Sequence, residues 1–134
     1  MLKKNGLKDT EVSVDHVYQV DLDGDGGDEV LIFANHYANR LRGDGVLDGD
    51  YSLLLLRQLK GNQVQTVPLY ERYITEDSQY ARAGYIEIVG LLDLNGDGDM
   101  EILARELFYK AYRYHIYDPD KDTSGSVLQL YCGE

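Results

Sequence analysis

Apolar and β-branched residues gather in short runs along this chain, and glycine-rich or acidic clusters separate the runs. Runs of this length, rich in valine, isoleucine, leucine and tyrosine, are typical of β-strands. The pattern therefore predicts strands over 16–22, 29–37, 51–59, 63–73, 84–94, 101–109, 111–118 and 126–133. The turn-forming clusters at 60–62 and 118–125 predict hairpins between neighbouring strands.

Three of these runs differ from a simple alternating strand. The leucine-rich run 51–59 suits a strand that is buried on both faces, although a short buried helix fits its periodicity as well. The run 101–109 also allows a helical turn. Pro68 removes a backbone donor from the run 63–73. That strand is therefore predicted to lie at a sheet edge or to contain a bulge.

The chain contains an internal repeat. The stretch DLDGDGGDEVLI, 21–32, recurs as DLNGDGDMEILA, 93–104, and the step from position 21 to position 93 defines the repeat offset. Flanking apolar positions align at the same offset, because Val17 falls on Val89 and Val30 on Ile102. Four strands per copy predict an all-β fold of two four-stranded antiparallel units. These units span about 11–72 and about 84–134 of a single 1–134 domain, with a linker loop at about 73–83.

Composition limits the classes of partner. Thirteen Lys+Arg against 24 Asp+Glu give a formal net charge of −11, which repels nucleic acid and anionic membrane surfaces. No apolar stretch reaches the roughly 18 residues that a membrane span needs, and residues 1–13 lack the apolar core of a signal peptide. We therefore expect no nucleic-acid partner and no membrane insertion, and we favour cations or basic partners.

The two repeated stretches carry oxygen ligands at alternate positions. Positions 1, 3, 5, 7 and 9 are Asp21, Asp23, Asp25, the Gly27 carbonyl and Glu29 in the first loop, and Asp93, Asn95, Asp97, the Asp99 carbonyl and Glu101 in the second. Glycines at positions 4 and 6 let the backbone curl around a central point. Such a cage suits Ca²⁺ better than Mg²⁺, because Ca²⁺ accepts about six to eight oxygens in flexible geometry. The sequence predicts two Ca²⁺ sites, with dissociation constants of about 10⁻⁴ to 10⁻³ M.

An EF-hand loop begins in the same way but ends differently. It requires a bidentate glutamate at position 12 and a helix after it. Position 12 is Ile32 in the first loop and Ala104 in the second, and β-forming residues follow both. The sequence therefore disfavours an EF-hand and a dockerin-like loop, and it favours a shorter loop between strands that closes with the glutamate at position 9.

The two loops and their flanking strands resemble the calcium loops of FG-GAP and VCBS-type repeats, which build integrin α-chain-like β-propellers and many bacterial surface proteins. In that family each repeat is a four-stranded propeller blade with the loop between its first two strands. The resemblance covers about 45 residues, and it implies an extracellular, cell-surface or periplasmic protein. A propeller needs about four to eight blades, whereas this chain has two. We therefore expect additional repeats in a longer chain, a homo-oligomer, or two sheets packed as a partial propeller or a compact sandwich.

Three further features have no clear functional pattern. Arg42-Gly43-Asp44 is an adhesion-type tripeptide on a glycine-rich loop, and a solvated loop is its simpler interpretation. Asp44, Asp48 and Asp50 could surround another cation, but their spacing matches no metal template. Cys132 is the single cysteine, so no disulfide forms within the chain. It is either a small buried hydrophobic residue or half of a bridge to a partner elsewhere.

Histidine and tyrosine give weaker indications of a binding surface. The three histidines share no zinc-ligand spacing and are expected to be solvated or core residues: His16, His36 and His115. Four of the 12 tyrosines are crowded together and could form an aromatic face for a glycan or protein partner: Tyr109, Tyr112, Tyr114 and Tyr117. Their simpler interpretation is the core and half-exposed face of a β-sheet.

Enzyme classes find little support in this sequence. Nothing near the serines or Cys132 suggests a nucleophile with a positioned general base, and the loop glycines alternate with aspartate, which repels phosphate. We expect a non-catalytic calcium-binding β-repeat module of a secreted or cell-surface protein, with a structural, adhesion or ligand-binding role. Two alternatives stay open: a small acidic inhibitor or immunity-type protein that binds a basic protein partner, and a carbohydrate-binding accessory domain.

Overall fold

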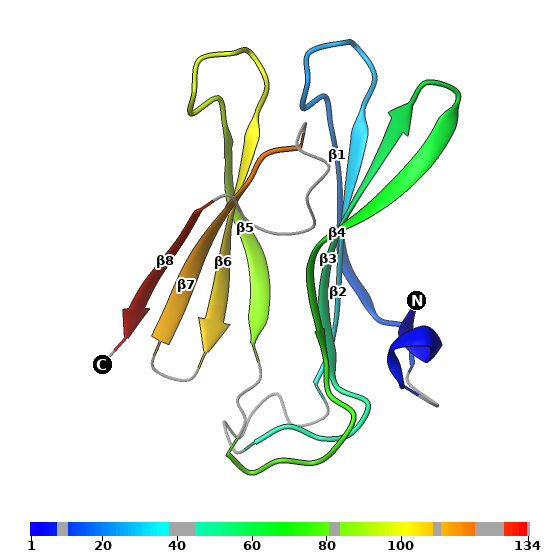
Figure 1. Cartoon of the computed structure of the whole chain (residues 1–134), viewed down its shortest axis with the longest axis vertical. Helices are drawn as coiled ribbons and strands as arrows, with labels where there is room; N and C mark the ends of the chain where they lie inside the picture. The colour runs from blue at the N-terminus through cyan, green and yellow to red at the C-terminus, as the bar shows by residue number, and fades with distance from the viewer. Residues whose placement is uncertain (8–10, 38–44, 81–83, 109–110, 120–127, 134) are drawn as a thin grey trace.

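The computed structural model describes residues 1–7, 11–37, 45–80, 84–108, 111–119 and 128–133 (Figure 1). A short 3₁₀ helix, η1 (Leu2–Asn5), precedes the strands β1 (Val14–Val20), β2 (Glu29–His36), β3 (Tyr51–Lys60), β4 (Gln63–Tyr73), β5 (Tyr85–Leu92), β6 (Glu101–Phe108), β7 (Ala111–Tyr117) and β8 (Leu128–Gly133). The strands form two antiparallel four-stranded sheets, in the orders β1-β2-β3-β4 and β5-β6-β7-β8. The predicted all-β fold with two four-stranded units is confirmed.

Both runs that allowed a helix are strands. Leu54 of β3 belongs to the core between the sheets and Leu53 to a second cluster on the opposite face, which explains the continuous leucine run. β4 is an edge strand, and its pairing with β3 shifts register between Leu54 and Leu55, beside Pro68. Both consequences predicted for Pro68 are therefore present. Within the described residues, no helix has the length and apolar character that crossing a membrane requires.

The two sheets are structural copies of each other. Val20 pairs with Glu29 where β1 and β2 leave the first acidic loop, and Leu92 pairs with Glu101 at the same place in the second sheet. The two pairs are related by the repeat offset of the loop sequences. Figure 1 shows the two loops at the same end of the molecule. Side chains related by the repeat offset in this region therefore occupy equivalent places.

The sheets use different faces to pack on each other. Because side chains alternate along a strand, each sheet has a front face, which contains Leu31 or its counterpart Leu103, and a back face, which contains Ile32 or its counterpart Ala104. The main core joins the front of the first sheet to the back of the second: Leu22, Leu31, Phe33, Leu54, Leu56 and Leu69 with Ile86, Ile102, Ala104 and Tyr117. The contact is therefore front to back.

The N-terminal segment covers part of the back face of the first sheet. Leu7 is buried against Ala34, Tyr51 and Leu53, and Leu2 packs at the margin of this cluster. Figure 1 shows η1 on the outer side of the first sheet, near the end opposite the acidic loops. The segment shields the lower part of this back face from water.

Candidate metal-binding loops

Each acidic loop joins the first two strands of its sheet, as the sequence predicts. Gly24 and Gly26 have φ angles of 68° and 87°, and their counterparts Gly96 and Gly98 have 82° and 101°. Glycine adopts this left-handed conformation without a steric penalty, whereas other residues rarely do. The two loops therefore curl in the same way, and the glycines at positions 4 and 6 make that curl possible.

Four backbone N–H groups of the first loop donate to side-chain oxygens within that loop, and all four bonds recur in the second loop at the repeat offset. In the first loop they run from Leu22 to Glu29 Oε2 (2.9 Å), Asp25 to Asp23 Oδ1 (3.2 Å), Gly26 to Asp21 Oδ2 (3.1 Å) and Gly27 to Asp25 Oδ1 (2.6 Å). In the second loop they run from Leu94 to Glu101 Oε2 (2.7 Å), Asp97 to Asn95 Oδ1 (2.8 Å), Gly98 to Asp93 Oδ2 (3.2 Å) and Asp99 to Asp97 Oδ1 (3.0 Å). The loops share their internal hydrogen bonding as well as their sequence.

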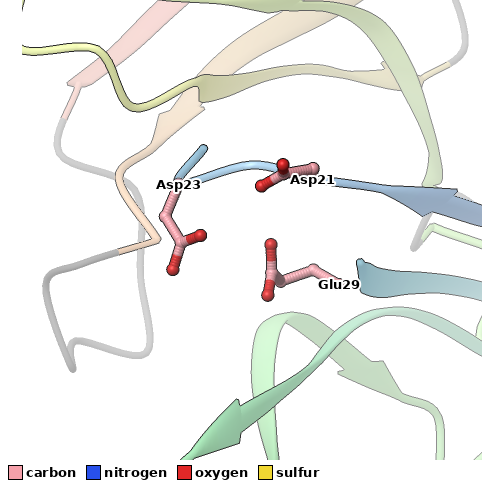
Figure 2. A group of neighbouring side chains, drawn as sticks. All are labelled: Asp21, Asp23 and Glu29. Atoms are coloured by element: carbon pink, nitrogen blue, oxygen red, sulfur yellow. The ribbon is translucent and has the colours of Figure 1, made fainter. Parts of the chain in front are cut away.

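Three carboxylates of the first loop converge. Asp21, Asp23 and Glu29 each place one oxygen within 4.8 Å of the others. Figure 2 shows the Glu29 carboxylate reaching from the start of β2 toward the two aspartates of the loop. Carboxylates this close repel one another unless a proton or a cation compensates their charge. This group could hold a metal ion.

Two properties distinguish this triad from a solvated acidic cluster. Glu29 is buried, and burial, together with the charges of Asp23, Asp25 and Asp21, raises its pKa despite the hydrogen bond from the Leu22 amide. Oδ1 of Asp21 is buried and has no hydrogen-bond partner among the described residues. A buried, unpaired carboxylate oxygen is costly. A cation at the triad would remove this cost.

The other predicted ligands of the first loop lie outside this triad. Asp25 directs Oδ1 to the N–H of Gly27 at 2.6 Å. Gly27, at position 7, contributes the donor of that bond, and its predicted role as a carbonyl ligand stays a prediction. The first loop therefore assembles three of its five predicted ligands around one point.

The second loop is held together in a different way. Asn95 replaces the aspartate at position 3, and its Nδ2 donates to Asp97 Oδ2 (2.7 Å) and Glu101 Oε1 (2.8 Å). Oδ1 of Asp93 accepts the N–H of Gly96 at 2.6 Å. The side-chain amide of Asn95 thus links positions 3, 5 and 9 by hydrogen bonds. These bonds hold the ligand side chains together, as a cation would. Asp99, at position 7, donates its N–H to Asp97.

Two of the other candidate features lie outside the described residues: the tripeptide 42–44, which includes Asp44, and Tyr109. Asp50 is buried and accepts the N–H of Leu47 at 2.9 Å, while the Asp48 N–H donates to Asp77 at 2.7 Å. Cys132 is exposed on β8. The hydrogen bonds of Asp48 and Asp50 therefore organise the loop before β3.

Some of the candidate histidines and tyrosines lie at the surface of the sheets, and others lie in the core. The His16 ring lies beside Tyr18, His36 stacks on Tyr51, and the buried His115 stacks on Tyr117 in the core. Tyr112 and Tyr114 meet edge to face with ring centroids 5.5 Å apart. The predicted aromatic cluster is thus divided between the surface of the second sheet and the core.

Glu106 is the buried charged residue that sequence reasoning missed. Its side chain is only 2% exposed, on the back face of the second sheet. Oε1 accepts the Tyr70 hydroxyl and lies 3.7 Å from Arg72 Nη1, both from β4 of the first sheet. Oε2 lies 3.1 Å from His115 Nε2 and 3.3 Å from Arg113 Nη1, both from β7. One carboxylate therefore joins the two sheets.

The surroundings of Glu106 keep it ionised. Burial by itself would raise the pKa of this carboxyl, but the hydrogen bonds with His115 and Tyr70 and the charges of His115 and Arg113 outweigh burial and lower it. The sequence contains a pattern that could have identified this residue. Side chains alternate along a strand, so Glu106 lies on the same buried face as Ile102 and Ala104. An acidic residue on a buried face requires partners.

No family model, curated protein or solved structure matches this chain. The functional argument therefore rests on the geometry of the loops themselves.

Proposed function

We propose that this chain is a non-catalytic calcium-binding β-repeat module of a secreted or cell-surface protein, with one Ca²⁺ in each acidic loop. The observation that carries the proposal is the repetition of the loop, with four equivalent hydrogen bonds in each copy and three converging carboxylates in the first. Asp-Gly clusters often form simple turns. A simple turn does not account for the convergence of Asp21, Asp23 and Glu29.

The ligand atoms in both loops would all be oxygens. Asp21, Asp23 and Glu29 would bind the first ion, with Asp25 and the Gly27 carbonyl as further ligands. The equivalent set in the second loop is Asp93, Asn95, Asp97, the Asp99 carbonyl and Glu101. Oxygen ligands select hard cations, and an irregular set of carboxylate, amide and carbonyl oxygens suits Ca²⁺ better than the near-octahedral Mg²⁺.

The ion would stabilise the start of each sheet. Asp21 directly follows β1, and Glu29 is the first residue of β2. A cation bound to both would link the ends of two neighbouring strands and compensate the repulsion among their carboxylates. We infer that this stabilisation supports a structural, adhesion or ligand-binding role of the surrounding surfaces.

Calcium is expected to raise the thermal midpoint of unfolding. A free Ca²⁺ concentration ten times the dissociation constant contributes about 1.4 kcal/mol for each site. Two sites would therefore raise the midpoint by roughly 10 °C in a chain of this length. The measurement is a thermal melt in EDTA and in millimolar Ca²⁺, with Mg²⁺ at the same concentration as the selectivity control. An unchanged midpoint would contradict the proposal.

Single substitutions separate a site from general charge attraction. Asp21→Asn removes the carboxylate that has the unpaired buried oxygen, and Asp28→Asn removes the same charge from position 8, where the side chain accepts the Gln19 amide at 2.7 Å. Calorimetry is expected to show about one ion per chain instead of two for Asp21→Asn and no change for Asp28→Asn. Equal effects of the two substitutions would point to nonspecific attraction.

A further inference from the structure

The front face of the second sheet faces away from the first sheet and carries an apolar groove beside the Glu87–Arg105 ion pair. Six side chains line a groove of about 290 Å³ there: Val89, Leu103, Tyr114, Ile116, Leu128 and Leu130. Leu130 on β8 is 56% exposed. An exposed apolar groove suits contact with another apolar surface.

This face is the structural counterpart of a face that is buried within the chain. Leu31 is fully buried in the core between the sheets, and its counterpart Leu103 lines the open groove. The same contrast holds at position 2 of the acidic loops, where Leu22 is 1% exposed and Leu94 is 52% exposed. The second sheet therefore presents to solvent the positions that the first sheet buries against its neighbour.

The internal contact also identifies what fits such a face. The front of the first sheet packs on the back of the second, where Ile102 and Ala104 contribute to the core. Their counterparts on the back of the first sheet are Val30 and Ile32, beside the 58% exposed Val17. These three residues are not part of the cluster that the N-terminal segment covers. Near the acidic loops, each molecule thus carries both halves of the same front-to-back contact.

We propose that the front face of the second sheet binds the back face of the first sheet of a second copy of this chain. This contact would repeat the internal one, in which the Met100 N–H donates to the Leu22 carbonyl at 2.7 Å. The equivalent bond between copies would join the Asp28 N–H of one molecule to the Leu94 carbonyl of the other. A head-to-tail contact of this type produces rings or open chains rather than closed two-fold dimers.

Charge determines the conditions under which the contact forms. The net charge of −11 opposes association of identical chains. Salt screens this repulsion, and Ca²⁺ bound to the loops would reduce it further. The association is therefore expected to be concentration-dependent and strongest in Ca²⁺ at moderate or high ionic strength.

Two substitutions block the two halves of the contact separately. Val17→Glu places a charge on the back face of the first sheet, and Leu130→Glu places one on the front face of the second. Tyr80→Glu, at a 92% exposed loop position, controls for the added charge. Because these side chains are largely exposed, the variants should fold, which circular dichroism checks. Val14→Glu, also on the back face and 51% exposed, replaces Val17→Glu if that variant is unfolded.

Sedimentation velocity over a concentration series distinguishes the outcomes. The unmodified chain and Tyr80→Glu are expected to form species beyond twice the 15.2 kDa monomer mass. Val17→Glu alone and Leu130→Glu alone are expected to be monomeric, and their equimolar mixture is expected to form a 1:1 dimer. A monomeric unmodified chain at all concentrations would overturn the proposal. It would also be overturned if Val17→Glu still dimerised, because the contact would then be two-fold between second sheets.

Discussion

Replacement of Glu106 by alanine is expected to lower the free energy of unfolding by about 3 kcal/mol. The substitution removes the buried carboxylate that accepts from Tyr70, His115 and Arg113 between the sheets. The partly buried Tyr70 and the buried His115 account for most of the loss, because Arg113 is 36% exposed and can turn to water. Urea denaturation measures the change.

Two substitutions test whether the loss comes from the burial of Glu106. Glu87 makes an ion pair with Arg105 on the other face of the same sheet, where both side chains are partly exposed. Exposed pairs contribute about 0 to 1 kcal/mol, so Glu87→Ala is expected to have a small effect. Glu106→Gln, which keeps the shape of the side chain, should lose less than Glu106→Ala. An equal loss for Glu87→Ala and Glu106→Ala would contradict the assigned role.

The contribution of Glu106 also depends on pH. Its pKa in the folded protein lies below the ordinary value of 4.5, so the folded state favours the ionised form. The stabilisation is fully present above the pKa of the unfolded chain and is lost as the pH falls through the lowered pKa of the folded state. The stability difference between the unmodified chain and Glu106→Gln should therefore narrow at acidic pH, whereas the loop carboxylates affect both proteins equally.

Leu31→Ala is expected to destabilise the chain by about 2 to 5 kcal/mol, whereas Leu103→Ala should cost about 1 kcal/mol. The two leucines occupy the same place in the two sheets, but Leu31 is fully buried and Leu103 lines the open groove. Removing Leu31 leaves a cavity between the sheets, and removing Leu103 leaves a shallower surface. Denaturation at low protein concentration, where copies of the chain are separate, measures both. Similar losses would show that the sheets do not pack front to back.

Local features of this fold could be predicted from the sequence because local chemistry determines them. Glycine at positions 4 and 6 of each loop is required by the positive φ angles. The repeat offset carries over into the strand register beside the loops, where Val20 pairs with Glu29 and Leu92 with Glu101, as far as the register shift between Ile88 and Gly90. Pro68 has no backbone N–H to donate to a neighbouring strand. This accounts for the edge position of β4 and for its register shift.

Other features depend on contacts between distant segments, so the sequence did not predict them. Leu22 and Leu94 are the same residue in the same motif, and only the order of the sheets buries one and exposes the other. Glu106 on β6 contacts Tyr70 on β4 across the sheet interface, and two strand connections, β4–β5 and β5–β6, separate them along the chain. The packing of Leu7 on Tyr51 likewise brings the N-terminal segment to a strand far along the chain.

The hydrogen bond between Met100 and Leu22 connects the two loops directly. The Leu22 amide donates to Glu29, its carbonyl accepts from Met100, and Met100 is followed by Glu101. A proposed ligand of one ion is thus linked to a proposed ligand of the other through two backbone residues. Fixing either loop restricts the other, so the first ion bound reduces the ordering that the second requires. Calcium titration of this chain would then be positively cooperative, with a Hill coefficient above that of two independent sites.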